Sequence, residues 1–299
     1  MSLTVHQVSK KYEAHLAVDS VSFNIQPGEI VGFLGPNGAG KSTTLKMIAG
    51  FLPSDQGAIT LNDCSIEKDP TAYKKSIGYL PESNPLYLDM YVKEYFHFLA
   101  EVHQIPNPNK RIQEVIGEVG LTIMQTKKMG ELSKGYQQRV GIGAAILHQP
   151  ALLLLDEPTS GLDPNQLIEI RQLIQSLSSK SMILFSTHIL QEVTAICSRV
   201  LVLHQGQLVA NEPIENLLKT SQNKVTVIFE QTIDAHLPEL KALGFQIELV
   251  DKHTLVAEAN DTTLLKNKLM SFALAKGLNI QSLQSQQASL EEIFKLLTH

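Results

Sequence analysis

Apolar residues follow two patterns along this chain, and together they predict a protein of alternating strands and helices. Short apolar runs are typical of buried strands, and they occur at residues 3–8, 21–25, 30–34, 58–61, 77–80, 152–155, 182–185 and 200–203. Ile112, Val115, Ile116 and Val119 recur at helical spacing and so share one helix face. We expect helices from the glycine-rich loop to about residue 50, through much of the stretch between the fifth and sixth strands, and at 166–177. Strands that alternate with helices favour a largely parallel sheet with a helical insertion.

A second pattern begins after residue 221. Apolar runs predict strands at 225–229, 245–250, 254–257 and 278–283, with helices at 237–243 and 263–275. A last helix is predicted at 289–298, because Ser289 and Glu292 form a capping box. We therefore expect a first domain over residues 1–221 and a small α+β accessory domain over residues 222–299.

The composition is that of an ordinary folded protein. Of 299 residues, 43% are hydrophobic and 18% are charged, which argues against wholesale disorder. The net charge of −5 makes a nucleic-acid partner unexpected. No run reaches the roughly 18 apolar residues of a membrane-spanning helix, and the first residues do not resemble a signal peptide. Cys64 and Cys197 lie far apart in sequence, so a reduced cytosolic setting fits best.

A glycine-rich loop lies between the predicted strand at 30–34 and a helix. It matches the pattern G-x-x-x-x-G-K-[ST], with the residues Gly35, Pro36, Asn37, Gly38, Ala39, Gly40, Lys41, Ser42 and Thr43. The backbone N–H groups of such a loop point at phosphate oxygens, and the helix N-terminus adds partial positive charge. Lys41 would reach the β- and γ-phosphates of a nucleotide, and the Ser42 hydroxyl would bind Mg²⁺. The order of strand, loop and helix argues against a chance glycine-rich turn.

Two acids, Asp156 and Glu157, follow the strand predicted at 152–155. A buried carboxylate needs a cation, and parallel sheets bind ligands at the carboxyl ends of their strands. Asp156 is therefore expected to hold Mg²⁺, usually through its water shell. Glu157 points in a different direction and could orient or deprotonate an attacking water. Alone, these acids would fit an ordinary turn equally well; beside the phosphate loop, metal binding is favoured.

Further motifs occur in the order typical of the ATP-binding-cassette (ABC) ATPase family, which this chain resembles from residue 3 to about 215. The family signature is Leu-Ser-Gly-Gly-Gln, and here the segment reads Leu132-Ser133-Lys134-Gly135-Tyr136. Ser133 and Gly135 match it, whereas Lys134 and Tyr136 depart from it. The segment Ser-Gly-Leu-Asp-Pro at 160–164 resembles the family's dimer-contacting loop, and the tripeptide ending at His188 resembles its histidine switch.

The resemblance implies a fold and a mechanism. The fold is an α/β P-loop NTPase domain with antiparallel β and helical subdomains, the helical one at about 85–150. The mechanism is hydrolysis of ATP with Mg²⁺ between two cassettes packed head to tail. Ser133 and Gly135 of one copy would then face the γ-phosphate bound by Lys41 of the other, while His188 would contact the same phosphate and Glu157 would act on water.

Two more positions come from the resemblance. Tyr12 lies where the family has an aromatic residue that stacks on adenine; the alternative is an ordinary surface tyrosine. Glu82 lies where the family has glutamine. A carboxylate can ligate Mg²⁺, but it cannot donate a hydrogen bond when ionised. Metal binding by Glu82 is therefore expected, and water positioning by this residue is left open.

The motifs most resemble cassettes of the ABC-2 exporter type, and among these the gliding-motility-associated ATP-binding subunits. This implies a separate integral membrane permease and a cytoplasmic, peripheral location on the inner face of the cytoplasmic membrane. Apolar and aromatic residues at 83–92 would border the groove for the permease's coupling helix, form part of the helical subdomain core, or do both. The cargo and the identity of the second cassette, an identical copy or a paralogue, stay open.

Other kinds of phosphate-loop protein are alternatives. A soluble, non-transport ABC ATPase that remodels a ribosome or DNA is disfavoured by the single phosphate loop and the lack of sustained heptads. A weakly hydrolysing partner cassette is suggested by the altered signature, although Glu157 and His188 are both present. A GTPase or a small-molecule kinase is disfavoured by the signature segment and by His188.

Overall fold

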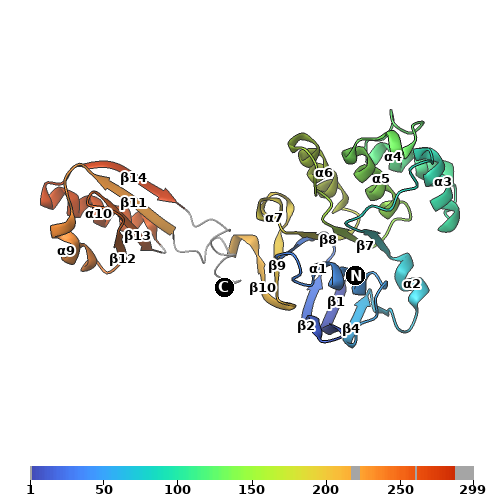
Figure 1. The fold of residues 1–299 in the computed structure, drawn as a ribbon, viewed down its shortest axis with the longest axis horizontal. Helices are drawn as coiled ribbons and strands as arrows, with labels where there is room; N and C mark the ends of the chain where they lie inside the picture. The colour runs from blue at the N-terminus through green and yellow to red at the C-terminus, as the bar shows by residue number, and fades with distance from the viewer. Residues whose placement is uncertain (1, 217–222, 260, 287–299) are drawn as a thin grey trace. The chain divides into compact units, whose positions relative to one another are not determined.

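The computed structural model describes residues 2–216, 223–259 and 261–286 (Figure 1). The chain divides into two compact units between Glu212 and Pro213. The sequence-based boundary after residue 221 and the helix expected at 289–298 both lie outside the described residues, so they stay predictions.

A six-stranded sheet forms the centre of the first unit, in the order β10-β9-β3-β8-β7-β6. The five strands from β9 to β6 are parallel. The strands are β3 (Ile30–Leu34), β6 (Ile77–Leu80), β7 (Leu152–Asp156), β8 (Met182–Thr187), β9 (Arg199–His204) and β10 (Gln207–Pro213). The five parallel strands were predicted. The edge strand β10 was not, because most of its residues are exposed and it has no apolar run.

A second, antiparallel sheet in the same unit has the order β2-β1-β4-β5. Its strands are β1 (Leu3–Tyr12), β2 (His15–Ile25), β4 (Gln56–Leu61) and β5 (Cys64–Ser65). The first two are longer than their apolar runs, because pairing continues through mostly polar or exposed residues as far as the pair Tyr12 and His15. The antiparallel β subdomain that the resemblance implied is therefore present.

The helices of the first unit include the predicted insertion. They are α1 (Lys41–Ile48), α2 (Pro70–Lys75), α3 (Val92–Val102), α4 (Pro108–Glu118), α5 (Lys134–Ile146), α6 (Pro164–Leu177) and α7 (Leu190–Ile196), with a 3₁₀ turn η1 (Met129–Glu131). The four residues that define the predicted face near Ile112 are all buried. Only α2 and α7, the two shortest helices, were not predicted.

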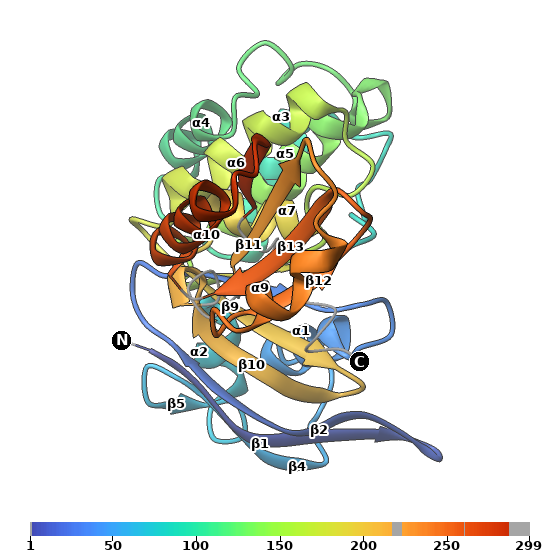
Figure 2. The same cartoon turned by 90° about the vertical axis from the view of Figure 1, so that its left-hand side faces the viewer.

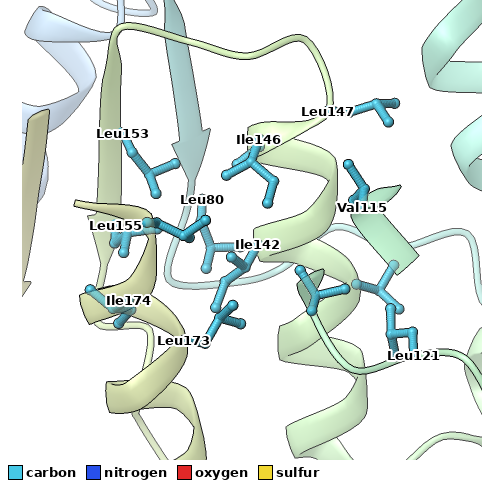
Figure 3. Close-up of a cluster of buried hydrophobic side chains, with 14 of the residues drawn as sticks. Leu80, Val115, Leu121, Ile142, Ile146, Leu147, Leu153, Leu155, Leu173 and Ile174 are labelled. Carbon is cyan, nitrogen blue, oxygen red and sulfur yellow. The ribbon is translucent and has the colours of Figure 1, made fainter. Parts of the chain in front are cut away.

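Each face of the parallel sheet is covered by a different hydrophobic core, and β7 contributes to both. Leu153 and Leu155 belong to a cluster with buried residues of α3 to α6, and Figure 3 shows part of this cluster. Leu152 and Leu154 pack on the opposite side, with α1 and the antiparallel sheet. Because side chains alternate along a strand, the strand is buried on both faces and its end is held firmly in place.

The second unit is an α+β fold with a core of its own (Figure 2). Its antiparallel sheet has the order β12-β13-β11-β14, and helix α10 packs on three of these strands. The elements are β11 (Asn223–Phe229), η2 (Asp234–His236), α9 (Leu237–Lys241), β12 (Gln246–Leu249), β13 (Thr254–Ala259), α10 (Thr262–Lys276) and β14 (Ile280–Gln286). All predicted strands and helices before residue 287 are found here, within a few residues. Among the helices that the structure describes, none is long and apolar enough to cross a bilayer.

Candidate functional site

A cavity of about 540 Å³ opens at the carboxyl edge of the parallel sheet. The segments that follow β3, β6, β7 and β8 meet there, because parallel strands end at the same edge. The cavity is lined by Tyr12, His15, Ala17, Asn37, Gly38, Ala39, Gly40, Lys41, Ser42, Thr43, Glu82, Glu157, Ser160 and His188. Most of the residues proposed from the sequence therefore share one cavity.

The glycine-rich loop connects β3 to the N-terminus of α1. Gly40 has a φ of 102°, and a Cβ there would collide with the backbone carbonyl of Ala17, so only glycine fits. Within the described part of the chain, no side chain caps the N-terminus of α1. Its first backbone N–H groups are therefore available to an anion in the cavity.

Lys41 is held by the loop itself. Its Nζ donates hydrogen bonds to the carbonyl oxygens of Gly35 (2.7 Å) and Pro36 (3.3 Å) and lies 3.6 Å from Glu157 Oε1. Burial lowers the pKa of Lys41, although the nearby carboxylates of Glu157 and Asp156 oppose this shift. The two carbonyl oxygens thus fix the ammonium group at the cavity, where it could also bind an incoming anion.

Asp156 ends β7 and is almost fully buried. Its Oδ1 accepts hydrogen bonds from Ser42 Oγ (3.1 Å) and from Ser186 Oγ (2.6 Å). Ser42 lies in the first turn of α1, whereas Ser186 lies on β8. The carboxylate therefore connects helix α1, which follows the glycine-rich loop, with the central strands β7 and β8.

Glu157 has an unusual backbone and two charged neighbours. Its φ is 50°, in the left-handed region that residues other than glycine seldom adopt. Its Oε2 lies 2.9 Å from His188 Nδ1, a hydrogen-bond distance. Burial raises the pKa of Glu157, and His188 and Lys41 partly oppose that shift. Strain and a raised carboxyl pKa in a cavity are both typical of functional sites.

The donor set near Ser42 fits Mg²⁺. A hydroxyl and a carboxylate oxygen are the hard ligands that this ion prefers, and it commonly completes its shell with phosphate oxygens and water. Residues 2–216, 223–259 and 261–286 contain no group of three His, Cys, Asp or Glu side chains that could hold a metal unaided. A metal at Ser42 and Asp156 would therefore depend on oxygens of a bound phosphate.

Of four further residues proposed from the family resemblance, two line the cavity and two lie elsewhere. Tyr12, 45% exposed, and Glu82 both line the cavity. Ser133 and Gly135 do not line it. Ser133 caps α5, accepting a hydrogen bond from the Tyr136 N–H, and Gly135 is buried in the first turn of that helix. One chain therefore does not bring the signature segment to its own phosphate loop.

Sequence reasoning missed several residues of the site. His15 and Ala17 line the cavity, and they come from β2, which no motif connects with the loop. Ser160 also lines the cavity, although the sequence placed it only in the segment that resembles a dimer-contacting loop. Ser186 was noted only as part of the tripeptide ending at His188. Its place at the end of a buried apolar strand, beside the strand that ends in Asp156, was the signal that could have identified its contact.

Comparison with known proteins gives the family. A family model described as "ABC transporter" matches residues 18–160. The linearmycin resistance ATP-binding protein LnrL of Bacillus subtilis (strain 168) is 32% identical over 307 residues, covering 99% of this chain and 98% of that protein. The chain belongs to the ABC transporter ATP-binding family.

Other matches to this ABC subunit agree. The bacitracin transport ATP-binding protein BcrA of Bacillus licheniformis is 32% identical over 299 residues, covering 96% of this chain and 94% of that protein. A solved structure titled as the ATP binding subunit of an ABC transporter aligns with a TM-score of 0.66 and 31% identity, covering 73% of this chain and 92% of that one. The predicted family and fold class are confirmed, and the protein is an ATP-binding, ATP-hydrolysing subunit of an ABC transporter.

Proposed function

We propose that this ABC subunit binds ATP and Mg²⁺ in the cavity at the glycine-rich loop and uses hydrolysis to drive export through a separate membrane permease. The observation that carries the proposal is the convergence of three features at one cavity, which Asp156 reaches through its hydrogen bond with the lining residue Ser42. These are the Lys41 loop, the pair Ser42 and Asp156, and the pair Glu157 and His188.

Binding of the nucleotide is assigned to the loop and its neighbours. The N-terminal N–H groups of α1 and the Lys41 ammonium would bind the phosphates, and Tyr12 would stack on adenine. Ser42 and Asp156 would hold Mg²⁺, with Glu82 at the same cavity as a further oxygen ligand. When bound, the metal would neutralise negative charge on the phosphate oxygens.

Hydrolysis is assigned to Glu157. Its carboxylate would orient the attacking water and take up its proton. The burial that raises the pKa of Glu157 also makes it a stronger base. His188, hydrogen-bonded to that carboxylate, would fix its orientation and contact the γ-phosphate from the open side of the cavity.

Completion of the site is assigned to a second cassette, an identical copy or a paralogue. Ser133 lies at the N-terminus of the 13-residue helix α5, a suitable position for binding an anion. It lies outside the lining of its own chain's cavity. In a head-to-tail dimer, Ser133 and Gly135 would face the γ-phosphate held by the partner's loop.

Contact with the permease is assigned to the segment after Glu82, at the inner face of the cytoplasmic membrane. Tyr87, Leu88 and Tyr91 are 58, 55 and 47% exposed, whereas Leu86 and Met90 pack against the helical core. The segment thus combines an anchor in the core with an exposed apolar surface, which suits a protein interface.

The cargo is proposed from the relatives. LnrL and BcrA are named for linearmycin resistance and bacitracin transport, and these names favour export of an antibiotic-like compound. The alternative suggested by the sequence, a role in gliding motility, stays a hypothesis. We also keep, as a proposal, the domain limits 1–221 for the ATP-binding domain and 222–299 for the accessory domain.

Affinity isolation of the tagged protein from its native membrane tests the transport assignment. We expect a multi-span membrane protein to co-purify in stoichiometric amount, and to be lost when Tyr87 and Tyr91 are both changed to Ser. Recovery of ribosomes or DNA without a membrane protein would refute transport while leaving the ATPase assignment intact.

A further inference from the structure

Ser186 lies between the two carboxylates of the site and contacts both residues. It is completely buried at the end of β8, in register with Asp156 on the neighbouring strand β7. Its Oγ donates to Asp156 Oδ1 at 2.6 Å and accepts the backbone N–H of Glu157 at 3.1 Å. A single hydroxyl therefore links the proposed metal ligand to the proposed base.

The direction of these hydrogen bonds is fixed by chemistry. A serine hydroxyl has one proton and two lone pairs, and an ionised carboxylate can only accept. The proton of Ser186 therefore goes to Asp156, and a lone pair of the same oxygen takes the Glu157 N–H. Consecutive hydrogen bonds of this kind polarise one another. Replacing Ser186 by alanine would therefore remove the hydrogen bonds of its hydroxyl to Asp156 and to the Glu157 N–H at the same time.

The backbone of Glu157 gives this contact a second consequence. Its φ of 50° is unfavourable for a glutamate, and such a conformation persists only where surrounding contacts determine it. The Glu157 N–H is shared between Ser186 Oγ and the Ser186 carbonyl oxygen, at 3.1 and 3.2 Å. Both acceptors belong to one residue, so Ser186 holds the turn that aims the Glu157 side chain.

We propose that Ser186 is a positioning residue for ATP hydrolysis, which sets Asp156 and Glu157 in a fixed relation to each other. It acts through these two residues and does not line the nucleotide cavity. The proposal rests on the proposed function, because it assumes that Asp156 and Glu157 have the roles given above.

The test uses the full-length protein with the variants Ser186→Ala and Ser186→Thr. The matched control is Ser181→Ala, which removes a hydroxyl that donates to the Pro150 carbonyl just before β8 begins. We expect Ser186→Ala to lower kcat by about 10- to 100-fold, as for other residues that orient a metal ligand. The affinity for ATP measured without a divalent cation should stay within about 3-fold, because the contacts of the glycine-rich loop with the phosphates are not changed. Ser186→Thr, which keeps the hydroxyl, should restore most of the activity, and Ser181→Ala should resemble the wild type.

A second measurement does not depend on turnover. In a Glu157→Gln background with ATP bound, the affinity for Mn²⁺ measured by electron paramagnetic resonance should fall about 10- to 100-fold on adding Ser186→Ala. Adding Ser181→Ala should leave it unchanged. If Ser186→Ala fails to fold, Ser186→Cys, whose thiol is a weak donor, is expected to show the same losses to a smaller degree.

The outcomes separate this proposal from the proposed function. Wild-type hydrolysis together with normal kcat and normal Mn²⁺ affinity in Ser186→Ala would overturn the role of Ser186 alone. Loss of activity in both Ser186→Ala and Ser186→Thr, with equal loss of thermal stability, would show a structural role and overturn it too. Absence of ATP hydrolysis by the wild type would refute the proposed function, and this proposal with it.

Discussion

Replacement of Glu157 by glutamine is the most direct test of the site. The amide has nearly the same size and can still accept a hydrogen bond from His188, now 2.9 Å from Glu157 Oε2. It cannot take a proton from water. General-base catalysis contributes about 10²- to 10⁴-fold, so kcat should fall by that factor, or about 3 to 5 kcal/mol in the activation barrier.

The binding of ATP should survive the same change. Lys41 would lose a carboxylate at 3.6 Å but keep its hydrogen bonds to the Gly35 and Pro36 carbonyl oxygens. Phosphate oxygens would replace the lost negative charge. The affinity for ATP should therefore stay within about 3-fold, and the variant should accumulate as an ATP-bound dimer.

The assay is release of inorganic phosphate at saturating ATP, with size-exclusion chromatography to detect the dimer. Glu169→Gln is the matched control, because Glu169 is 57% exposed and pairs with Arg139 away from the cavity. It should have wild-type turnover. Glu157→Gln turning over within about 3-fold of the wild type would refute the assignment of Glu157 as the base.

Three further predictions follow from the described contacts. Lys41→Ala should weaken ATP binding by at least about 10-fold, the effect of losing a hydrogen bond to a charged group; unchanged affinity for a fluorescent ATP analogue would contradict the loop assignment. Because burial raises the pKa of Glu157 above its ordinary value of 4.5, the carboxylate is protonated at a higher pH than usual. Hence kcat/KM should fall on acidification with a midpoint above 4.5, and a midpoint at or below that value would contradict a buried base. Phe96→Ala, in the core beside α5, should lower the free energy of unfolding in urea by about 3 to 5 kcal/mol; Phe98→Ala on the same helix, where the ring is 43% exposed, should cost far less.

The sequence predicted the parts of the fold whose residues report directly on burial. The run at Leu152–Leu155 and the helical face at Ile112 were found because every residue in them is buried. Edge strand β10 and the outer parts of β1 and β2 were not, since their pairing is between backbone groups and most of their side chains are polar or exposed. Such segments give little apolar signal even though they are regular structure.

The candidate site was predictable where a motif has a fixed spacing. Lys41, Ser42, Asp156, Glu157 and His188 were named from their motifs, and the structure places them together. The contribution of β2 and the hydroxyl on β8 depended on how distant strands pair. Which strands are neighbours depends on the order of strands in each sheet, and a single sequence does not reveal this order.

Strand β7 consists of four leucines followed by Asp156, so only its last residue can mark the register of the strand during folding. In most strands a shift of one residue moves apolar side chains out of the core, and this fixes the register. Leu152, Leu153, Leu154 and Leu155 are identical, so a shifted strand would still fill both cores with leucine. The hydrogen bonds of Asp156 to Ser42 and Ser186 distinguish the correct alignment. Asp156, the proposed metal ligand, therefore also marks the register of the strand that carries it. Replacing it with an apolar residue would remove both the hydrogen bonds that fix the alignment and the proposed ligand.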